Sequence, residues 1–419
     1  MKINFINQNN NIFAFFLYFT LIFGFLIGEN LNYGSYYDWI YAYVKPIKDF
    51  SLNFFDTLLN YDQYGQRHSP VYLIFLSVFL DFGLTFEQIR FLHLHLSIPL
   101  IVIFYHCLKL QFNKVDPKYL QLLSLTIFLS PTFRSLSIWP DSRLPGLLFF
   151  VLSIYFFLKF KKNASIKYVW FNCISLIISS YISPNFSVFF IYFLIFFIKK
   201  INNKNLIKLL FFNFLAAMPM LYYILILKVN FLVSGKTPGL NGESIAINFN
   251  FADKIMIISS IILFHLLPIL MNNSFYYKKF LNFIKKNIFK ILLLLIILMY
   301  FFNYQTSYTG GGFFFQLSNL FFNNNYLFFL LSFFSISLVI YLSFLNSKNF
   351  LLLLLLFLSN IQNSIYHKYY EPMIVIMFFT LLQNVNAENF FKKKINLIYL
   401  YIFNLVFILL RLFKNNYLL

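Results

Sequence analysis

Charged and aromatic side chains gather in a few short stretches of an otherwise apolar chain. One of them, SPTFRSLSIWPDSRLPG at residues 130–146, carries Arg134 and Asp141 between two long apolar runs. Another, NYGSYYDWIYAY at residues 32–43, surrounds Asp38 with aromatic rings. A carboxylate in such a partly dry setting holds a proton more readily than one in water, which suits a proton acceptor. Asp38 is therefore a candidate catalytic base, the alternative being an interfacial helix whose aspartate faces water.

Two further stretches combine a histidine with a permanent cation. In YDQYGQRHSPVY, Arg67 and His68 precede a proline and an apolar run. In IYHKYYEP, His367, Lys368 and Glu371 share one short loop. Guanidinium and ammonium groups pair with phosphate, so both stretches suit a phosphate-bearing ligand at the depth of the lipid headgroups. The alternatives are ordinary headgroup binding for the first stretch and a solvated loop for the second.

The stretch EQIRFLHLHL contains a different kind of acid–base pair. Glu87 and Arg90 are three residues apart, so on a helix they would form an i, i+3 ion pair that positions the helix. His93 and His95 are two residues apart and face different sides of a helix, which makes them a poor pair of metal ligands. We favour a structural role for this stretch.

Sequence motifs of soluble enzymes are absent. The chain contains no G-x-x-x-x-G-K-[ST], no G-x-S-x-G and no H-E-x-x-H pattern, so we do not expect ATP-driven transport by this chain. Its two cysteines, Cys107 and Cys173, fall in apolar runs. They are expected to be small buried residues rather than parts of a disulfide framework or a zinc site.

The composition places these stretches in a membrane protein. The 419-residue chain is 60% hydrophobic and 11% charged, and apolar runs able to cross about 30 Å of hydrocarbon recur along it. The first run, residues 11–28, lacks a small-residue cleavage site, so we interpret it as a retained span rather than a signal peptide. The net charge of +20 comes in short lysine clusters between the runs, which is typical of cytoplasmic loops and not of nucleic-acid binding.

The lysine clusters predict the orientation of each span. If they are cytoplasmic, the helix that ends at Lys159 starts outside near Leu144, and Asp141 lies on the outer face. The predicted fold is all-α and polytopic, with about 13 membrane spans and not fewer than about 11. The clusters lie at residues 159–167, 199–208, 278–290 and 392–394, and the expected spans at residues 11–28, 88–110, 119–133, 144–159, 168–182, 186–198, 209–228, 251–271, 289–303, 325–346, 350–363, 373–387 and 396–412.

Residues 29–87 form one long segment on the predicted outer face. This segment holds more than half of the 13 acidic residues of the chain, which agrees with an outer location. Within it, the apolar stretch Pro70–Leu80 is too short for an ordinary span. We expect a juxtamembrane helix that lies in the outer interface, the alternative being a true short span. No extramembrane stretch is long enough for an independent soluble domain.

In their order and common sidedness, these features resemble the GT-C superfamily of membrane glycosyltransferases. Asp38 resembles the acidic residue early in the first outer loop of that family. His68–Ser69–Pro70 resembles its H-P-P-like element, and Ser130–Pro131 with Arg134 and Asp141 resembles its SP…R…D pattern. The likeness is greatest to the bacterial protein-mannosyltransferase-like and lipopolysaccharide-core transferase-like families.

The resemblance also predicts how the chain is divided. It covers about residues 10–200, so we expect a catalytic membrane module at 1–200 and a variable C-terminal transmembrane module at 201–419. Two departures from the family pattern stand out. Asp38 lacks the paired acidic residue of the metal-dependent members, and the proline element reads H-S-P here.

The resemblance implies an inverting transfer of a sugar from a polyprenyl-phosphate donor to an envelope glycolipid, glycan or protein acceptor. The enzyme would be a multi-pass protein of the cytoplasmic (inner) membrane of a bacterium, with its active site on the periplasmic side. Asp38 would accept the proton of the acceptor hydroxyl, and Asp141 would orient the acceptor or a bound cation. Positive charge would stabilise the phosphate leaving group. The candidates for that contact are Arg67, His68, Arg134, His367 and Lys368.

The implied partners are the lipid-linked sugar donor, the envelope acceptor and the lipid bilayer, with no nucleic acid among them. The reaction requires no cofactor. If a divalent cation takes part, Mg²⁺ or Mn²⁺ would be expected, with Asp38 and Asp141 as its ligands.

Other functions stay open at this point. An O-antigen-type polymerase also has many spans, but it would favour large, arginine-bearing outer loops late in the chain. A flippase or transporter of lipid-linked sugars, without transferase activity, would place ionisable residues within spans or break helices in symmetric positions. His265 and Lys228 are the late candidates for such residues. A third alternative is a homologue that keeps the fold without catalysis.

Overall fold

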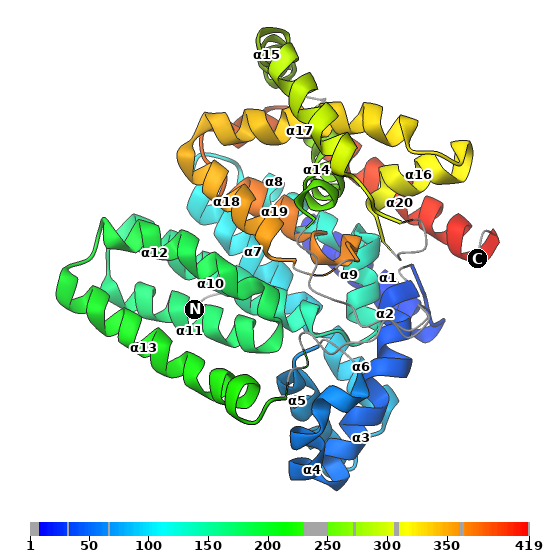
Figure 1. The fold of residues 1–419 in the computed structure, drawn as a ribbon, viewed down its shortest axis with the longest axis vertical. Helices are drawn as coiled ribbons and strands as arrows, with labels where there is room; N and C mark the ends of the chain where they lie inside the picture. Colours follow the sequence, from blue (N-terminus) through cyan, green and yellow to red (C-terminus); the bar gives the residue numbers. More distant parts are fainter. Residues whose placement is uncertain are drawn as a thin grey trace. The chain divides into compact units, whose positions relative to one another are not determined.

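The computed structural model describes residues 8–31, 33–65, 68–229, 231, 250–270, 274–305, 310–360, 362 and 364–417. Every regular element within these ranges is a helix, which confirms the predicted all-α class (Figure 1). The chain divides into two units, each described by itself. The first unit comprises Met1–Ala246 with Asn404–Leu419, and the second comprises Ile247–Phe403. The predicted division at residue 200 falls inside the first unit, between two helices.

The helices follow one another through short connections. In the first unit they are α1 (Gln8–Leu26), α2 (Tyr33–Tyr37), the π-helix η1 (Asp38–Tyr43), α3 (Val44–Leu52), α4 (Phe54–Leu59), η2 (Tyr61–Tyr64), α5 (Pro70–Asp81), α6 (Phe86–Leu94), α7 (Ser97–Gln111), α8 (Pro117–Leu125), η3 (Thr126–Leu129), α9 (Pro131–Ile138), α10 (Arg143–Asn163), α11 (Ile166–Ile182), η4 (Pro184–Phe189), α12 (Phe190–Ile198), α13 (Asn203–Leu221) and η5 (Tyr222–Ile226). In the second unit they are α14 (Phe251–Leu270), α15 (Ser274–Phe301), α16 (Gly312–Phe322), α17 (Tyr326–Leu345), α18 (Ser347–Leu358), η6 (His367–Tyr369), α19 (Met373–Thr380), η7 (Ala387–Lys392) and the start of α20 (Lys394–Tyr417), whose end belongs to the first unit.

Six helices in the described part of the chain are long and apolar enough to cross a membrane. Each coincides with a predicted span, which agrees with a membrane protein. The predicted total of about 13 spans and their orientation stay predictions. The six helical stretches are Phe86–Gln111, Arg143–Asn163, Asn203–Ile226, Phe251–Leu270, Tyr326–Leu345 and Lys394–Asn415.

Large apolar side chains stay exposed along several of these helices. On α13, for example, Leu209 is buried while Ile207, Phe211, Phe214 and Leu215 are exposed. In water such a surface would be an extended apolar patch. Against lipid tails it carries no penalty, since every backbone hydrogen bond of the helix is made internally.

The predicted span at residues 119–133 is wrong as a single helix. The chain breaks there into α8, η3 and α9. Ser130 has extended backbone dihedrals (φ −70°, ψ 119°), because a residue before a proline is pushed out of the α region. Its hydroxyl accepts a hydrogen bond from the backbone N–H of Phe133, so Ser130–Pro131 starts a new helix. The break sets the direction of α9, which carries Arg134.

The predicted span at residues 373–387 is also shorter than expected. Helix α19 ends at Thr380, and Asn384 and Asn386 have positive φ angles of 57° and 39°. Asparagine tolerates this left-handed conformation, which ends a helix. An eight-residue helix rises only about 12 Å, so α19 by itself cannot cross the hydrocarbon layer.

The predicted outer segment consists of short helices, as expected for residues 29–87. The stretch around Pro70–Leu80 is helical as α5, and α5 packs against α3 and α11. Ser69 caps α5, since its hydroxyl accepts from the backbone N–H of Val71 and donates to the carbonyl of Tyr181 in α11. The residue immediately before this cap is His68.

In the second unit, α14 contacts α15, α16, α17, α18 and α19. Its side chains are buried around nearly the whole circumference, as expected of a helix that is apolar on every face. Polar groups on such a helix are enclosed by protein, and His265 is one of them.

Candidate active site

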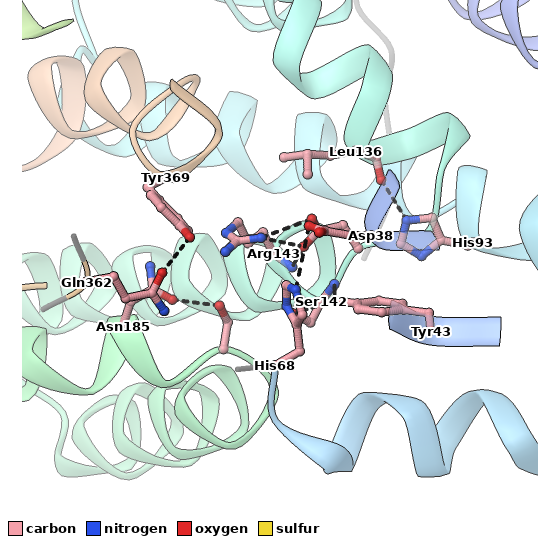
Figure 2. Close-up of polar contacts among 12 residues, drawn as sticks. Asp38, Tyr43, His68, His93, Leu136, Ser142, Arg143, Asn185, Gln362 and Tyr369 are labelled. Atoms are coloured by element: carbon pink, nitrogen blue, oxygen red, sulfur yellow. Dashed lines mark hydrogen bonds and ion pairs between the residues drawn. The ribbon is translucent and has the colours of Figure 1, made fainter. Parts of the chain in front are cut away.

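The carboxylate of Asp38 meets the ring of His68 in the first unit. His68 Nε2 lies 3.5 Å from Asp38 Oδ2 (Figure 2). The two side chains come from separate elements, since Asp38 begins η1 and His68 precedes the cap of α5. His68 is held in place because its carbonyl accepts a hydrogen bond of 2.8 Å from the hydroxyl of Tyr61. The predicted Asp38 and His68 positions therefore belong to one site.

Tyr43 connects this pair to the stretch around Asp141. Its ring meets the His68 ring edge to face, with centroids 4.9 Å apart. The Tyr43 hydroxyl donates to Ser142 Oγ at 3.2 Å and accepts from the Ser142 backbone N–H at 3.1 Å. Burial raises the pKa of Tyr43 well above its usual value, and the charges of Asp141 and Asp38 raise it further. Tyr43 is thus a neutral hydroxyl between two carboxylates.

The π-helix explains how Asp38 and Tyr43 come to the same site. The N–H of Val44 bonds to the carbonyl of Trp39, five residues earlier, as π-helical turns require. Residues five apart on an α-helix would point about 140° away from each other. The wider π turn brings them closer to one side. π-helical turns are frequent at functional sites.

Asp141 is buried and is paired with Arg143. Its carboxylate oxygens accept from Arg143 Nη1 at 3.1 Å and 3.0 Å, and Oδ1 also accepts from the backbone N–H of Arg143 at 2.9 Å. Arg143 is the first residue of α10, where a negative charge is favoured by the helix dipole. The guanidinium and the helix end together stabilise an ionised carboxylate that water does not reach.

Asp38, Tyr43, His68, Asp141, Ser142 and Arg143 form what we call the outer cluster. Asp38 and Asp141 differ in access within it, since 22% of the Asp38 side chain is exposed and none of the Asp141 side chain is. Only the first can contact a substrate directly. Asp141 fits a positioning role, in which it orders Arg143 and the start of α10.

Arg134 forms a separate ion pair. Its Nε and Nη2 donate to the two carboxylate oxygens of Glu29 at 2.7 Å and 2.6 Å. The remaining bonds go to the hydroxyl and carbonyl of Thr20 and to the carbonyl of Phe128. All five N–H groups of the guanidinium are thus used by partners in the described part of the chain. Arg134 ties α9 to α1 and keeps no donor for a phosphate while Glu29 is in place.

The predicted Glu87–Arg90 ion pair is confirmed. Arg90 Nη1 donates to both Glu87 oxygens at 2.7 Å. The guanidinium also lies over the ring of Trp139, 3.8 Å from its centroid. The pair positions α6 against the end of α9, as expected of a structural contact.

His367 and Lys368 lie in the second unit and are buried there. His367 Nδ1 is 3.3 Å from Nε2 of His265, and the same His265 nitrogen is 3.8 Å from Oε2 of Glu371. Arg67 lies outside the described residues. The predicted phosphate contacts of Arg67, His68, His367 and Lys368 therefore stay predictions.

Several residues of the site were not anticipated from the sequence. Tyr43 and Ser142 lie in the stretches that drew attention, but nothing in the sequence singles out one tyrosine among 30. Glu29 gave no signal either, because its partner is distant along the chain. His265 did give one, as an ionisable residue within a predicted span.

Comparison of the chain with protein-family models, with curated proteins and with solved structures gives no match.

Proposed function

We propose that this chain is an integral-membrane glycosyltransferase. It transfers a sugar from a polyprenyl-phosphate donor to an envelope glycolipid, glycan or protein acceptor on the outer face of the cytoplasmic membrane. The observation that carries the proposal is the 3.5 Å approach of His68 Nε2 to Asp38 Oδ2 beside Asp141. Three stretches that resemble glycosyltransferase motifs contribute side chains to the outer cluster, and the proposal rests on the first unit alone.

In the proposed reaction, Asp38 accepts the proton of the acceptor hydroxyl as the oxygen attacks the anomeric carbon. The bond from that carbon to the phosphate oxygen breaks on the opposite face, so the configuration inverts. The electron pair of that bond leaves with the polyprenyl phosphate. No group on the enzyme becomes covalently attached to the sugar.

The partial exposure of Asp38 supports its assignment as the base, since a base must reach the hydroxyl it deprotonates. His68 orients the carboxylate from one side and offers its other face to a ligand. Positive charge is needed where the phosphate leaves, and Arg67 and His68 are the candidates in this unit. Arg134 is not part of this proposal, because Glu29 occupies it.

A divalent cation fits this site poorly. Asp141 is engaged by Arg143, so the guanidinium already supplies positive charge to that carboxylate. Asp38 is the one exposed carboxylate of the outer cluster. The proposed reaction therefore uses no metal at Asp38 and Asp141.

The test uses purified full-length protein in lipid nanodiscs with labelled polyprenyl-phosphate sugars and envelope acceptors. Wild-type protein is expected to transfer label, and Asp38→Asn to lose about 100-fold or more in rate while still binding donor. Asp81→Asn is the matched control, because Asp81 is an exposed aspartate of the same segment. Transfer by Asp38→Asn at the wild-type rate would overturn the base assignment. Label that moves across the bilayer without transfer would overturn the enzyme in favour of a flippase.

A further inference from the structure

Three metal-ligand side chains meet in the interior of the second unit. His265 projects from α14, His367 begins η6, and Glu371 follows two residues after that short helix. One ligand atom from each lies within 4.8 Å of the others, and all three residues are buried. They are separate from the outer cluster in the chain and belong to the other unit.

The spacing of the ligand atoms fits a small transition-metal ion. Zinc binds histidine nitrogen and carboxylate oxygen at about 2.0–2.2 Å, so the edges of its tetrahedron are about 3.4 Å long. The measured separations are 3.3 Å for His265 Nε2 to His367 Nδ1 and 3.8 Å for His265 Nε2 to Glu371 Oε2. Small side-chain rotations close the remaining gaps. A Mg²⁺ or Ca²⁺ site would instead be built mainly of oxygen atoms.

The backbone around His367 is held by contacts that do not involve these three side chains. The N–H of Ile365 donates to the Tyr304 hydroxyl at 3.2 Å, and its carbonyl accepts from the N–H of Gly311 at 2.9 Å. Gly310 lies so close to the Ile365 carbonyl that a Cβ there would clash with it. The N–H groups of Tyr370 and Glu371 both bond to the carbonyl of His367 at 2.9 Å. Ligands on a fixed backbone are suited to a defined coordination geometry.

Charge balance also supports a cation at this place. A buried carboxylate needs a positive partner, and two neutral imidazoles supply none. The nearby Lys368 is directed to the ring of Tyr366, with Nζ 5.6 Å from the ring centroid. A divalent ion bound by two histidines and one glutamate would neutralise the carboxylate directly.

We propose that the second unit binds one transition-metal ion of the zinc class through His265 Nε2, His367 Nδ1 and the carboxylate of Glu371. Three protein ligands leave one position of a tetrahedral shell for water or another ligand. The site joins α14, which lies against most of the other helices of the unit, to the loop before α19. The inference does not depend on the proposed transferase activity.

The experiment measures metal bound to full-length protein purified in detergent through a tag that contains no histidine. After dialysis against Zn²⁺ and removal of free metal, wild-type protein is expected to hold about one equivalent. Glu371→Gln and His367→Gln are expected to bind at least about tenfold more weakly. The control is Glu388→Gln, since Glu388 is an exposed carboxylate of the same unit. His106→Gln in the first unit controls for the loss of a histidine.

Titration of wild-type protein with Co²⁺ tests the site without any variant. Tetrahedral cobalt bound to nitrogen and oxygen gives visible absorption bands of high intensity, and added Zn²⁺ should abolish them. Wild-type protein without bound zinc and without these bands would overturn the proposal. Full zinc binding by a folded Glu371→Gln and His367→Gln double variant would overturn the ligand assignment.

Discussion

His68 Nε2 lies 3.5 Å from Asp38 Oδ2, and both side chains keep part of their surface open. The ring is fixed from behind, because Tyr43 packs against it edge to face and Tyr61 binds the His68 carbonyl. The carboxylate is therefore oriented by a group that cannot easily turn away. This relationship leads to the first prediction.

We predict that His68→Gln lowers the rate of sugar transfer about tenfold or more, with the fold intact. Glutamine keeps a polar group but loses the rigid ring that orients Asp38. The measurement is transfer rate against donor concentration, which separates the rate from donor binding. His95→Gln, a partly exposed histidine of the same unit, should leave the rate unchanged. Equal rates for His68→Gln and wild type would remove His68 from the site.

Tyr43→Phe should destabilise the protein by about 1–3 kcal/mol, because the buried Ser142 hydroxyl and N–H lose their partner. Thermal unfolding in detergent measures this loss. Tyr41→Phe on the same π-helix is the control, since Tyr41 is exposed. A Tyr43→Phe protein as stable as this control would mean that the contact contributes nothing.

The pH dependence of Tyr43 has a definite sign. Its pKa in the folded protein lies well above the usual value, whereas an unfolded tyrosine ionises near pH 10. The contribution of Tyr43 to stability is therefore constant below about pH 10 and falls as the pH rises above it. Wild type and Tyr43→Phe should show the same pH dependence of activity up to about pH 9. A difference in that range would mean that Tyr43 titrates.

Arg134→Met should destabilise the protein by about 3–5 kcal/mol, because it leaves the Glu29 carboxylate buried without its partner. Glu29→Gln should be costly for the same reason, and the double variant should cost less than the two single changes added together. Donor affinity of the folded Arg134→Met protein should stay at the wild-type value. A large loss of affinity with little loss of stability would restore Arg134 as a phosphate contact.

Gly24→Ala offers a test with an unusual sign. Alanine in place of glycine inside a helix normally stabilises by about 0.5–1 kcal/mol. Here the added Cβ would lie 2.7 Å from Glu29 Oε2 and 3.0 Å from Arg134 Nη2, so it would push the ion pair apart. We expect a lower unfolding temperature. In a Glu29→Ala background, which removes the nearest atoms, the same change should cost less.

Local sequence signals were sufficient for the elements that depend on near neighbours. The apolar runs predicted six helices that can cross a membrane, and Ser69–Pro70 lies at the start of a predicted helix that is present. The i, i+3 spacing of Glu87 and Arg90 predicted their ion pair. Each of these depends on contacts within a few residues, where spacing along the chain determines distance in space.

Asp38, His68 and Asp141 could be selected from the sequence because ionisable groups are rare in so apolar a chain. Their amino-acid types and their place between apolar runs were enough to make them candidates. Arg134 was selected in the same way, but the sequence could not assign its partner. Glu29 is far from it along the chain, and other carboxylates of the outer segment were equally eligible.

Only the tertiary structure decided which of these charges meet. The π-helical turn brings Asp38 and Tyr43 toward one side, which no α-helical periodicity predicts. The break at Ser130–Pro131 directs Arg134 to Glu29, and the packing of α14 in its unit brings His265 to His367 and Glu371. Composition determines that a chain buries its charges in lipid or in protein. The partners they find there depend on the crossing of helices that are distant in sequence, and pair distances across such crossings are not encoded in local spacing.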